Sequence, residues 1–174
     1  MTTQGIDFSR LSLQDALDLA ILIEEEAEER YQEFAHQMEI HHTPEAALFF
    51  HAMARNEARH RIRLTERRRR IFADAPRQMG RGMVWDVEAP EYDEARAFMT
   101  PRQAMETALG GEEKAHQFFV AALPLIRDPG ARALFEELRD EEVQHQDLVR
   151  QELAKLPPEA AVDPEDFTDE PTGQ

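Results

Sequence analysis

Residues 50–64, FHAMARNEARHRIRL, decide the fold that this sequence predicts. Phe50 and Met53 begin an apolar stripe whose spacing of three and four residues is that of one helix face. Glu57 and His60 continue the same stripe, at positions that a buried apolar side chain would normally occupy. This helix must therefore pack against other helices with an acid and an imidazole turned inward.

A second stretch repeats the pattern. Residues 135–149, FEELRDEEVQHQDLV, place Phe135 and Leu138 before Glu142 and His145 at the same spacing. Both stretches thus carry a Glu-x-x-His pair preceded by two large apolar residues on the stripe. The match indicates an internal repeat.

The segments upstream of these two helices are also alike. Glu24 lies on a stripe with Ile21 and Tyr31, and Glu112 lies on a matching stripe that ends at Phe119. The repeated unit is therefore a helical hairpin with one acid on its first helix and Glu-x-x-His on its second. Two such hairpins predict a bundle with pseudo-twofold symmetry and all six donors near its axis.

Start signals and breakers predict the helix bounds. Ser12 with Asp15, and the pairs Thr43-Pro44 and Thr100-Pro101, are typical helix N-termini. The four predicted helices cover residues 12–39, 44–72, 101–123 and 129–156. A long crossover over residues 73–99 connects the second helix to the third. We expect one domain over residues 1–156, with Met83-Val84-Trp85 against its core and a short helix over 91–98. Residues 157–174, acidic and without a base, are expected to be a disordered tail.

Composition excludes several classes of protein. The 174 residues are 41% hydrophobic and 32% charged, with a net charge of −16, which disfavours binding to nucleic acid or anionic lipid. The absence of cysteine excludes disulfide scaffolds, cysteine zinc sites and Fe–S clusters. No apolar run reaches the roughly 18–20 residues of a membrane span. The first residues lack the features of a signal peptide, so we expect a cytoplasmic location.

Electrostatics indicates what the inward-facing donors are for. An ionised carboxylate in an apolar interior costs several kcal/mol, and four close together also repel one another. No Lys or Arg lies on these stripes to compensate. Two divalent cations would supply four positive charges, and the two imidazoles would complete their coordination. Oxygen and imidazole donors suit iron, manganese or zinc.

The alternative is that these residues hold no metal. A single Glu-x-x-His is usually a solvated pair of neighbours on a helix. Two such pairs in the same apolar context, with the matched Glu24 and Glu112, favour a metal site instead.

The four helices resemble the ligand helices of rubrerythrins and their erythrin relatives, in the ferritin-like di-iron carboxylate superfamily. The resemblance covers residues 12–155 and rests on four motifs: Glu24 to Tyr31, Met53 to His60, Glu112, and Leu138 to His145. It implies a ferritin-like bundle holding two irons. It also implies that Glu57 and Glu142 bridge the metals, that Glu24 and His60 bind one iron, and that Glu112 and His145 bind the other.

The resemblance further implies a homodimer that oxidises Fe(II) with dioxygen or hydrogen peroxide. Two departures stand out. Without cysteine the chain cannot carry a rubredoxin module, so reductive turnover would need an external electron donor. Rubrerythrins also carry a further carboxylate three residues after the third-helix glutamate, where this chain has Ala115.

Several neighbours of the donors carry weaker predictions. Glu28 and His116, each four residues past a ligand glutamate, are candidates for an extra ligand or for a residue beside the ligands. Tyr31 is expected to orient a carboxylate with its hydroxyl, the alternative being a plain core aromatic. Gly110-Gly111 weakens its helix and could let a neighbouring backbone or loop approach Glu112.

Other polar groups are interpreted as surface features. The arginines of the second helix are expected to pair with glutamates of the first and not to bind nucleic acid; they are Arg55, Arg59, Arg61, Arg63 and Arg67 to Arg70. His41, His42 and His51 are expected to be exposed.

Three functions follow. The first is a di-iron oxidase that turns over Fe(II). The second is an iron carrier that delivers iron to a storage, encapsulating or membrane-transport partner. The third is a metal-free helical interaction domain.

Overall fold

The computed structural model describes residues 6–83, 87–90 and 99–157. These ranges contain four long helices and no strand. The helices are α1 (Leu13–Ile40), α2 (Pro44–Phe72), α3 (Pro101–Ala122) and α4 (Pro129–Leu153). Short 3-10 helices cover Phe8–Arg10, Arg81–Met83 and Leu123–Leu125. The predicted all-α four-helix bundle is confirmed.

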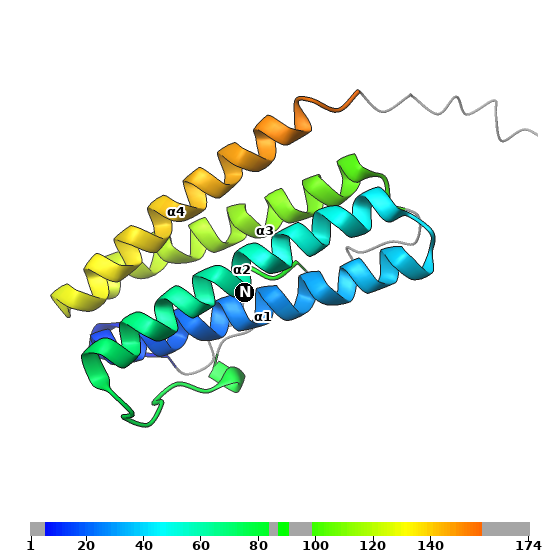
Figure 1. Cartoon of the computed structure of the whole chain (residues 1–174). Helices are drawn as coiled ribbons and strands as arrows, with labels where there is room; N and C mark the ends of the chain where they lie inside the picture. The colour runs from blue at the N-terminus through cyan, green and yellow to red at the C-terminus, as the bar shows by residue number, and fades with distance from the viewer. Residues whose placement is uncertain (1–5, 84–86, 91–98, 158–174) are drawn as a thin grey trace, which may run out of the picture.

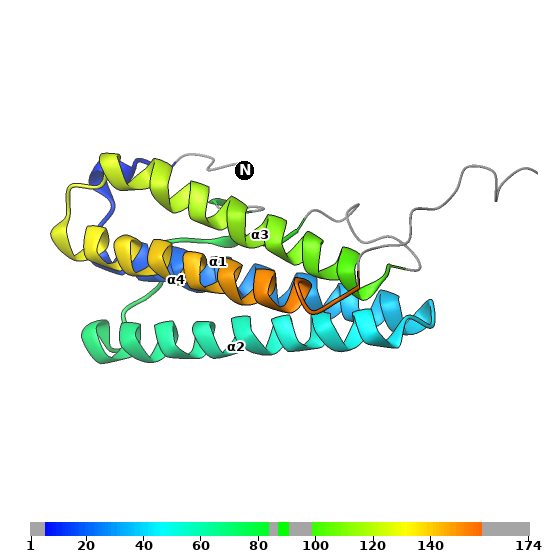
Figure 2. The ribbon, with the colours of Figure 1, turned by 90° about the horizontal axis from the view of Figure 1, so that it is seen from above.

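Two antiparallel hairpins make up the bundle. The largest helix contacts lie within the pairs α1/α2 and α3/α4, with further contacts between α1 and α4 and between α2 and α3. Helices α1 and α4 run in one direction and α2 and α3 in the other (Figure 1). Seen from above, α1 and α4 lie between α3 on one side and α2 on the other (Figure 2). Helix α2 ends at one end of the bundle and α3 begins at the other (Figure 1). The connection between them must therefore run the length of the bundle.

The predicted helix starts hold, with one difference. Ser12 and Asp15 form a reciprocal capping box, and Thr100 forms another with Gln103. Thr43 occupies the N-cap position of α2 but does not cap it. Its hydroxyl donates instead to the carbonyl of Met38, 3.1 Å away at the end of α1. Thr43 therefore joins the two helices of the hairpin.

Apolar faces of the helices form a core on both sides of the donor residues. One cluster at the α1 N-terminal end includes Phe8, Leu17, Phe118 and Phe135, and Met83 packs at its edge as predicted. The other cluster includes Phe34 and Phe50, whose rings meet edge to face. The six predicted donors lie on the helices between these clusters.

The start of the crossover is anchored to α1. The Arg68 guanidinium, at the C-terminal end of α2, forms a buried pair with the Asp18 carboxylate. The other Asp18 oxygen accepts from the backbone N–H of Gln78 at 2.8 Å. Arg68 also donates to the carbonyl of Ala75 at 2.9 Å. This network holds the chain against the bundle as it leaves α2.

Three sequence predictions fall partly or wholly outside the described residues: the short helix over 91–98, the packing of Val84 and Trp85, and the acidic tail beyond residue 157. Among the described helices, none is long and apolar enough to cross a membrane.

Candidate metal centre

The structure brings the six predicted donors together as two mirrored clusters. One contains Glu24 from α1 with Glu57 and His60 from α2, and the other contains Glu112 from α3 with Glu142 and His145 from α4. Within each cluster, one ligand atom from every residue lies within 4.8 Å of the others. The helical repeat therefore produces two equivalent half-sites.

Each imidazole faces two carboxylates of its own half-site. His60 Nδ1 lies 3.7 Å from Glu24 Oε2 and 3.5 Å from Glu57 Oε2. His145 Nδ1 lies 3.1 Å from Glu112 Oε2 and 3.7 Å from Glu142 Oε2.

The two half-sites adjoin across the bundle. The rings of His60 and His145 stack with centroids 4.7 Å apart and planes 10° from parallel. The two sets of donors therefore surround one shared space.

The four glutamates are almost fully buried, and each has an oxygen that lacks a hydrogen bond. Their exposed fractions are 5% or less. Among the described residues, none donates a hydrogen bond to the Oε2 atoms of Glu24, Glu57 and Glu142 or to Oε1 of Glu112. Such atoms are rare in a folded protein because each costs about 1–3 kcal/mol. They indicate a ligand that accepts their lone pairs.

Burial raises the pKa values of acids on both hairpins. Burial raises the pKa of Glu24 to about 8, and the charge of Glu57 adds to the shift, although His60 opposes it. Burial likewise raises the pKa of Glu142 well above its ordinary value, and the Glu112 charge acts in the same direction. The metal-free site therefore favours protonated carboxyl groups.

The pKa values of the two histidines are also raised, here because the neighbouring carboxylates favour the charged imidazolium. Burial lowers the pKa of His60, but Glu24 and Glu57 outweigh it and raise that pKa to about 9. Burial is likewise outweighed at His145, where Glu112 and Glu142 raise the pKa to about 11. Both imidazoles hold protons that a bound metal would displace.

The donor set fits two divalent cations. No Lys or Arg of the described chain forms an ion pair with Glu24, Glu57, Glu112 or Glu142. Two cations would balance the four carboxylates and use the orphaned oxygens as ligands. Carboxylate and imidazole are donors that iron, manganese and zinc accept.

A fifth buried acid at this site, Glu88, was not predicted from the sequence. It lies in the crossover, is 2% exposed, and places a carboxylate oxygen within 4.8 Å of ligand atoms of Glu57 and Glu112. A connector has no periodicity that could place its side chains. The only signal was Gly110-Gly111, from which an approaching loop was predicted, and this approach is confirmed at Gly111. A Cβ there would lie 2.6 Å from the Glu88 carbonyl oxygen, whereas one at Gly110 would meet open space.

Tyr31 lies beside the donors. It is fully buried, its ring stacks on Phe50, and its hydroxyl lies 3.2 Å from the point where a Gly111 Cβ would be. Burial and the charges of Glu112, Glu57 and Glu88 raise the pKa of Tyr31 well above its ordinary value. The hydroxyl has no hydrogen-bond partner among the described residues.

Glu28 and His116 are not part of the clusters. Glu28 accepts a 2.7 Å hydrogen bond from Arg61 Nε. His116 is only partly buried, and neither residue belongs to the groups of described residues that could hold a metal. The structure thus provides no support for either as an extra ligand.

Among the described residues, four arginines of α2 pair with acids, two of them on α1 and two on α4. Arg61 pairs with Glu28 as predicted, while Arg63 and Arg67 pair with Glu141 and Glu137 of α4. The acids expected for them on α1 pair elsewhere, Glu25 with Arg77 and Glu29 with Arg81. Of the three histidines predicted to be exposed, His42 is exposed, and His41 and His51 are half-buried.

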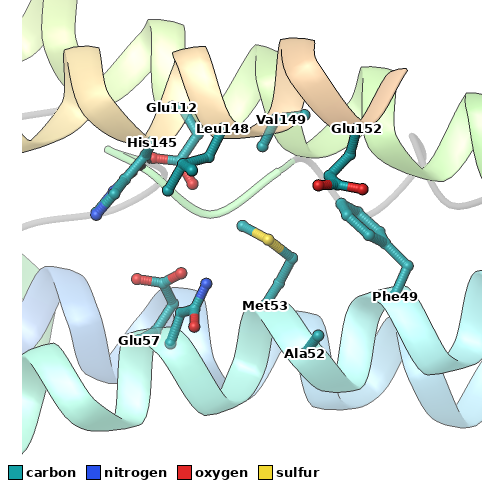
Figure 3. Close-up of a pocket in the computed structure, with 10 residues that line it drawn as sticks. Phe49, Ala52, Met53, Glu57, Glu112, His145, Leu148, Val149 and Glu152 are labelled. Carbon is teal, nitrogen blue, oxygen red and sulfur yellow. Dashed lines mark hydrogen bonds and ion pairs between the residues drawn. The ribbon is translucent and has the colours of Figure 1, made fainter. Parts of the chain in front are cut away.

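A groove between α2 and α4 leads to the donors (Figure 3). It has a volume of about 200 Å³. Phe49, Met53, Leu148 and Val149 line its apolar part, and Glu57, Glu112 and His145 lie at its inner end. Small molecules and ions could reach the donors by this route.

A helical bundle with two mirrored Glu/His clusters defines a carboxylate-rich protein of the ferritin-like class. The model of the Rubrerythrin family matches residues 15–153, and the chain belongs to this family. No curated protein matches the chain significantly.

Two solved structures share the fold of this chain. An uncharacterized conserved protein from Magnetospirillum magnetotacticum MS-1 is 28% identical, with a TM-score of 0.64 over 87% of this chain and 99% of that one. The bacterioferritin of Rhodobacter capsulatus, described with a metal-free dinuclear site and haem iron, is 18% identical, with a TM-score of 0.56 over 86% of this chain and 96% of that one. The bacterioferritin supports the fold alone.

Proposed function

We propose that this chain binds two iron ions between its four helices and oxidises Fe(II) to Fe(III) with dioxygen or hydrogen peroxide. The observation that carries the proposal is the set of four buried glutamates, each with an orphaned oxygen, that converge with two histidines in the absence of a compensating Lys or Arg among the described residues. Membership of the Rubrerythrin family supports iron as the metal.

The proposed ligands divide between the hairpins. Glu24 and His60 would hold one metal, Glu112 and His145 the other, and Glu57 and Glu142 would bridge them. Manganese or zinc could occupy the same donors. The Tyr31 hydroxyl would donate a hydrogen bond to a ligand carboxylate and orient it.

The redox chemistry is that of the iron. When bound, two Fe(II) ions would supply one electron each, and one hydrogen peroxide with two protons would accept both electrons and leave as two waters. The chain's own contribution is to hold both ions in a site shielded from water and to release protons from its carboxyl and imidazole groups as they bind. Reduction back to Fe(II) would need an external electron donor.

The test is anaerobic loading with Fe(II), followed by rapid mixing with dioxygen or peroxide and measurement of Fe(III) absorbance. The oxidase predicts many Fe(II) oxidised per chain when Fe(II) is in excess. A single stoichiometric oxidation would instead indicate a carrier that passes iron to a partner. If the protein neither binds nor oxidises Fe(II), the proposal is wrong.

A matched control separates site chemistry from oxidation at the surface. The variant Glu57→Ala removes an inward-facing carboxylate, whereas Glu29→Ala removes one paired with Arg81 on the exterior. Only Glu57→Ala should abolish the reaction. Size-exclusion chromatography with light scattering would test the homodimer that the family resemblance implies.

A further inference from the structure

The crossover carries a buried acid in the space between the two half-sites. Val87, Glu88, Ala89 and Pro90 are all buried, although they belong to no helix. A connector usually runs over the surface because its backbone needs partners. This burial means that residues 87–90 are packed into the bundle as part of its interior.

Contacts from two helices fix the backbone just after Glu88. Lys114 Nζ of α3 donates to the Ala89 carbonyl at 2.7 Å. The buried Arg30 guanidinium of α1 donates to the Pro90 carbonyl. The crossover is therefore clamped between α1 and α3 just after Glu88.

A glycine makes the close approach to α3 possible. A Cβ at Gly111 would lie 2.6 Å from the Glu88 carbonyl oxygen and 3.7 Å from the Pro90 ring, so any other residue would push the crossover away. Ile23 stands at the corresponding position of the first hairpin, before Glu24, and is fully packed in the core. Only the second hairpin has room for the crossover.

The Glu88 side chain reaches both half-sites. Its carboxylate lies near Glu57 of one half-site and Glu112 of the other. Each of the three residues offers an oxygen within 4.8 Å of the other two. Glu57 and Glu112 are 1% and 0% exposed, and each has an oxygen without a hydrogen-bond partner among the described residues. No Lys or Arg of the described chain forms an ion pair with Glu88. Three buried acids thus meet at one point without a Lys or Arg partner among the described residues.

We propose that Glu88 is a seventh metal ligand, a carboxylate that the crossover supplies between Glu57 and Glu112. This inference rests on the proposed dinuclear site and specifies its ligand set. With Glu88 the site carries five carboxylates. Their charge exceeds that of two divalent cations by one negative unit and suits a centre that gains positive charge when its metals are oxidised.

Metal titration tests the proposal without reference to turnover. Isothermal calorimetry with Mn(II) would compare the wild-type chain with Glu88→Gln, which keeps the size of the side chain. We expect one of the two Mn(II) ions to bind about 10–100-fold more weakly in Glu88→Gln, as for the loss of a group that supports a metal. The control Glu29→Gln, which loses a crossover contact to Arg81 outside the site, should bind as the wild type does.

Co(II) absorption provides a second readout. Removing a ligand changes the coordination of one Co(II), so the visible bands of Co(II)-loaded Glu88→Gln should differ in position and intensity from those of the wild type. An identical spectrum and identical Mn(II) affinities would show that Glu88 is a structural, protonated acid and would overturn the proposal.

Variants of Gly110 and Gly111 keep the proposal testable if Glu88→Gln fails to fold. Gly111→Ala should displace the crossover and reproduce the weak binding, whereas Gly110→Ala, with open space at its Cβ, should not. Equal metal binding by the two alanine variants would contradict the proposal. If the wild-type chain itself binds no metal, the proposed function fails as a whole; if it binds two and Glu88→Gln binds them equally well, only the role of Glu88 fails.

Discussion

The two hairpins supply the same donors but differ in what surrounds them. In the first, Ile23 precedes Glu24 and Tyr31 lies on the same face; in the second, Gly111 precedes Glu112 and Phe119 takes the place of the tyrosine. The space that the Ile23 side chain fills is, beside Gly111, taken by the crossover backbone. Helical periodicity therefore builds the symmetric donors, while the single crossover makes the site asymmetric.

The largest expected effect comes from removing an acid that both halves share. Glu57→Gln and Glu142→Gln should each lose at least one of two bound metals, because the two acids are proposed to bridge them. In the metal-free state the same variants should be more stable than the wild type by about 1–3 kcal/mol, since a buried carboxylate with an oxygen that accepts no hydrogen bond opposes folding. Metal analysis and urea unfolding with and without metal would measure both. Unequal losses would show that the halves are not equivalent.

The next effect concerns the glycine that breaks the symmetry. Gly111→Ala should destabilise the metal-free protein by about 1–3 kcal/mol because the new Cβ would collide with the Glu88 carbonyl. Gly110→Ala should stabilise it by about 0.5–1 kcal/mol through helix propensity. Urea unfolding measures both. Destabilisation by both variants, or by neither, would contradict the close approach of the crossover.

A pH series tests the charges of the half-site on the first hairpin. Burial raises the pKa of Glu24 to about 8, so the stability that its protonation contributes is full below the ordinary value of 4.5 and is lost as the pH rises through about 8. The pKa of His60 is raised to about 9, so its contribution is full below 6.5 and is lost as the pH rises through 9. Both predict that the Tm of the metal-free protein falls by several degrees from pH 6 to pH 9.

Bound metal should reduce this dependence, because it takes the place of the protons. Differential scanning calorimetry of the metal-free and metal-loaded protein at both pH values would measure it. A Tm of the metal-free protein that rises with pH would contradict the electrostatic account.

The smallest effect is expected at Tyr31 and at Phe119, the matched aromatic positions of the two hairpins. Tyr31→Phe removes a buried hydroxyl that has no partner among the described residues, so the metal-free protein should gain up to about 1 kcal/mol. With metal bound, the same variant should lose stability if the hydroxyl then orients a carboxylate. Phe119→Leu, at the matched position, is a control for aromatic packing and should lose stability in both states. A Tyr31→Phe variant indifferent to metal would make Tyr31 a core residue only.

Much of the fold could be predicted because it depends on local signals. Ser12, Thr100 and the prolines fix the helix starts, and the three- and four-residue spacing places Glu57 and His60 on the buried face. The partners of Arg63 and Arg67 could not be predicted, since they depend on how far apart the hairpins pack. Glu88 could not be found either, because only the clamp by Arg30 and Lys114 brings it to the donors.

The six donors are proposed to hold two metals. Anomalous diffraction from crystals grown with Fe(II) or Mn(II) tests it directly. We predict two peaks about 3.5–4 Å apart, one beside Glu24 and His60 and the other beside Glu112 and His145. No peak between the helices in metal-soaked crystals, or peaks only at surface acids, would contradict the account.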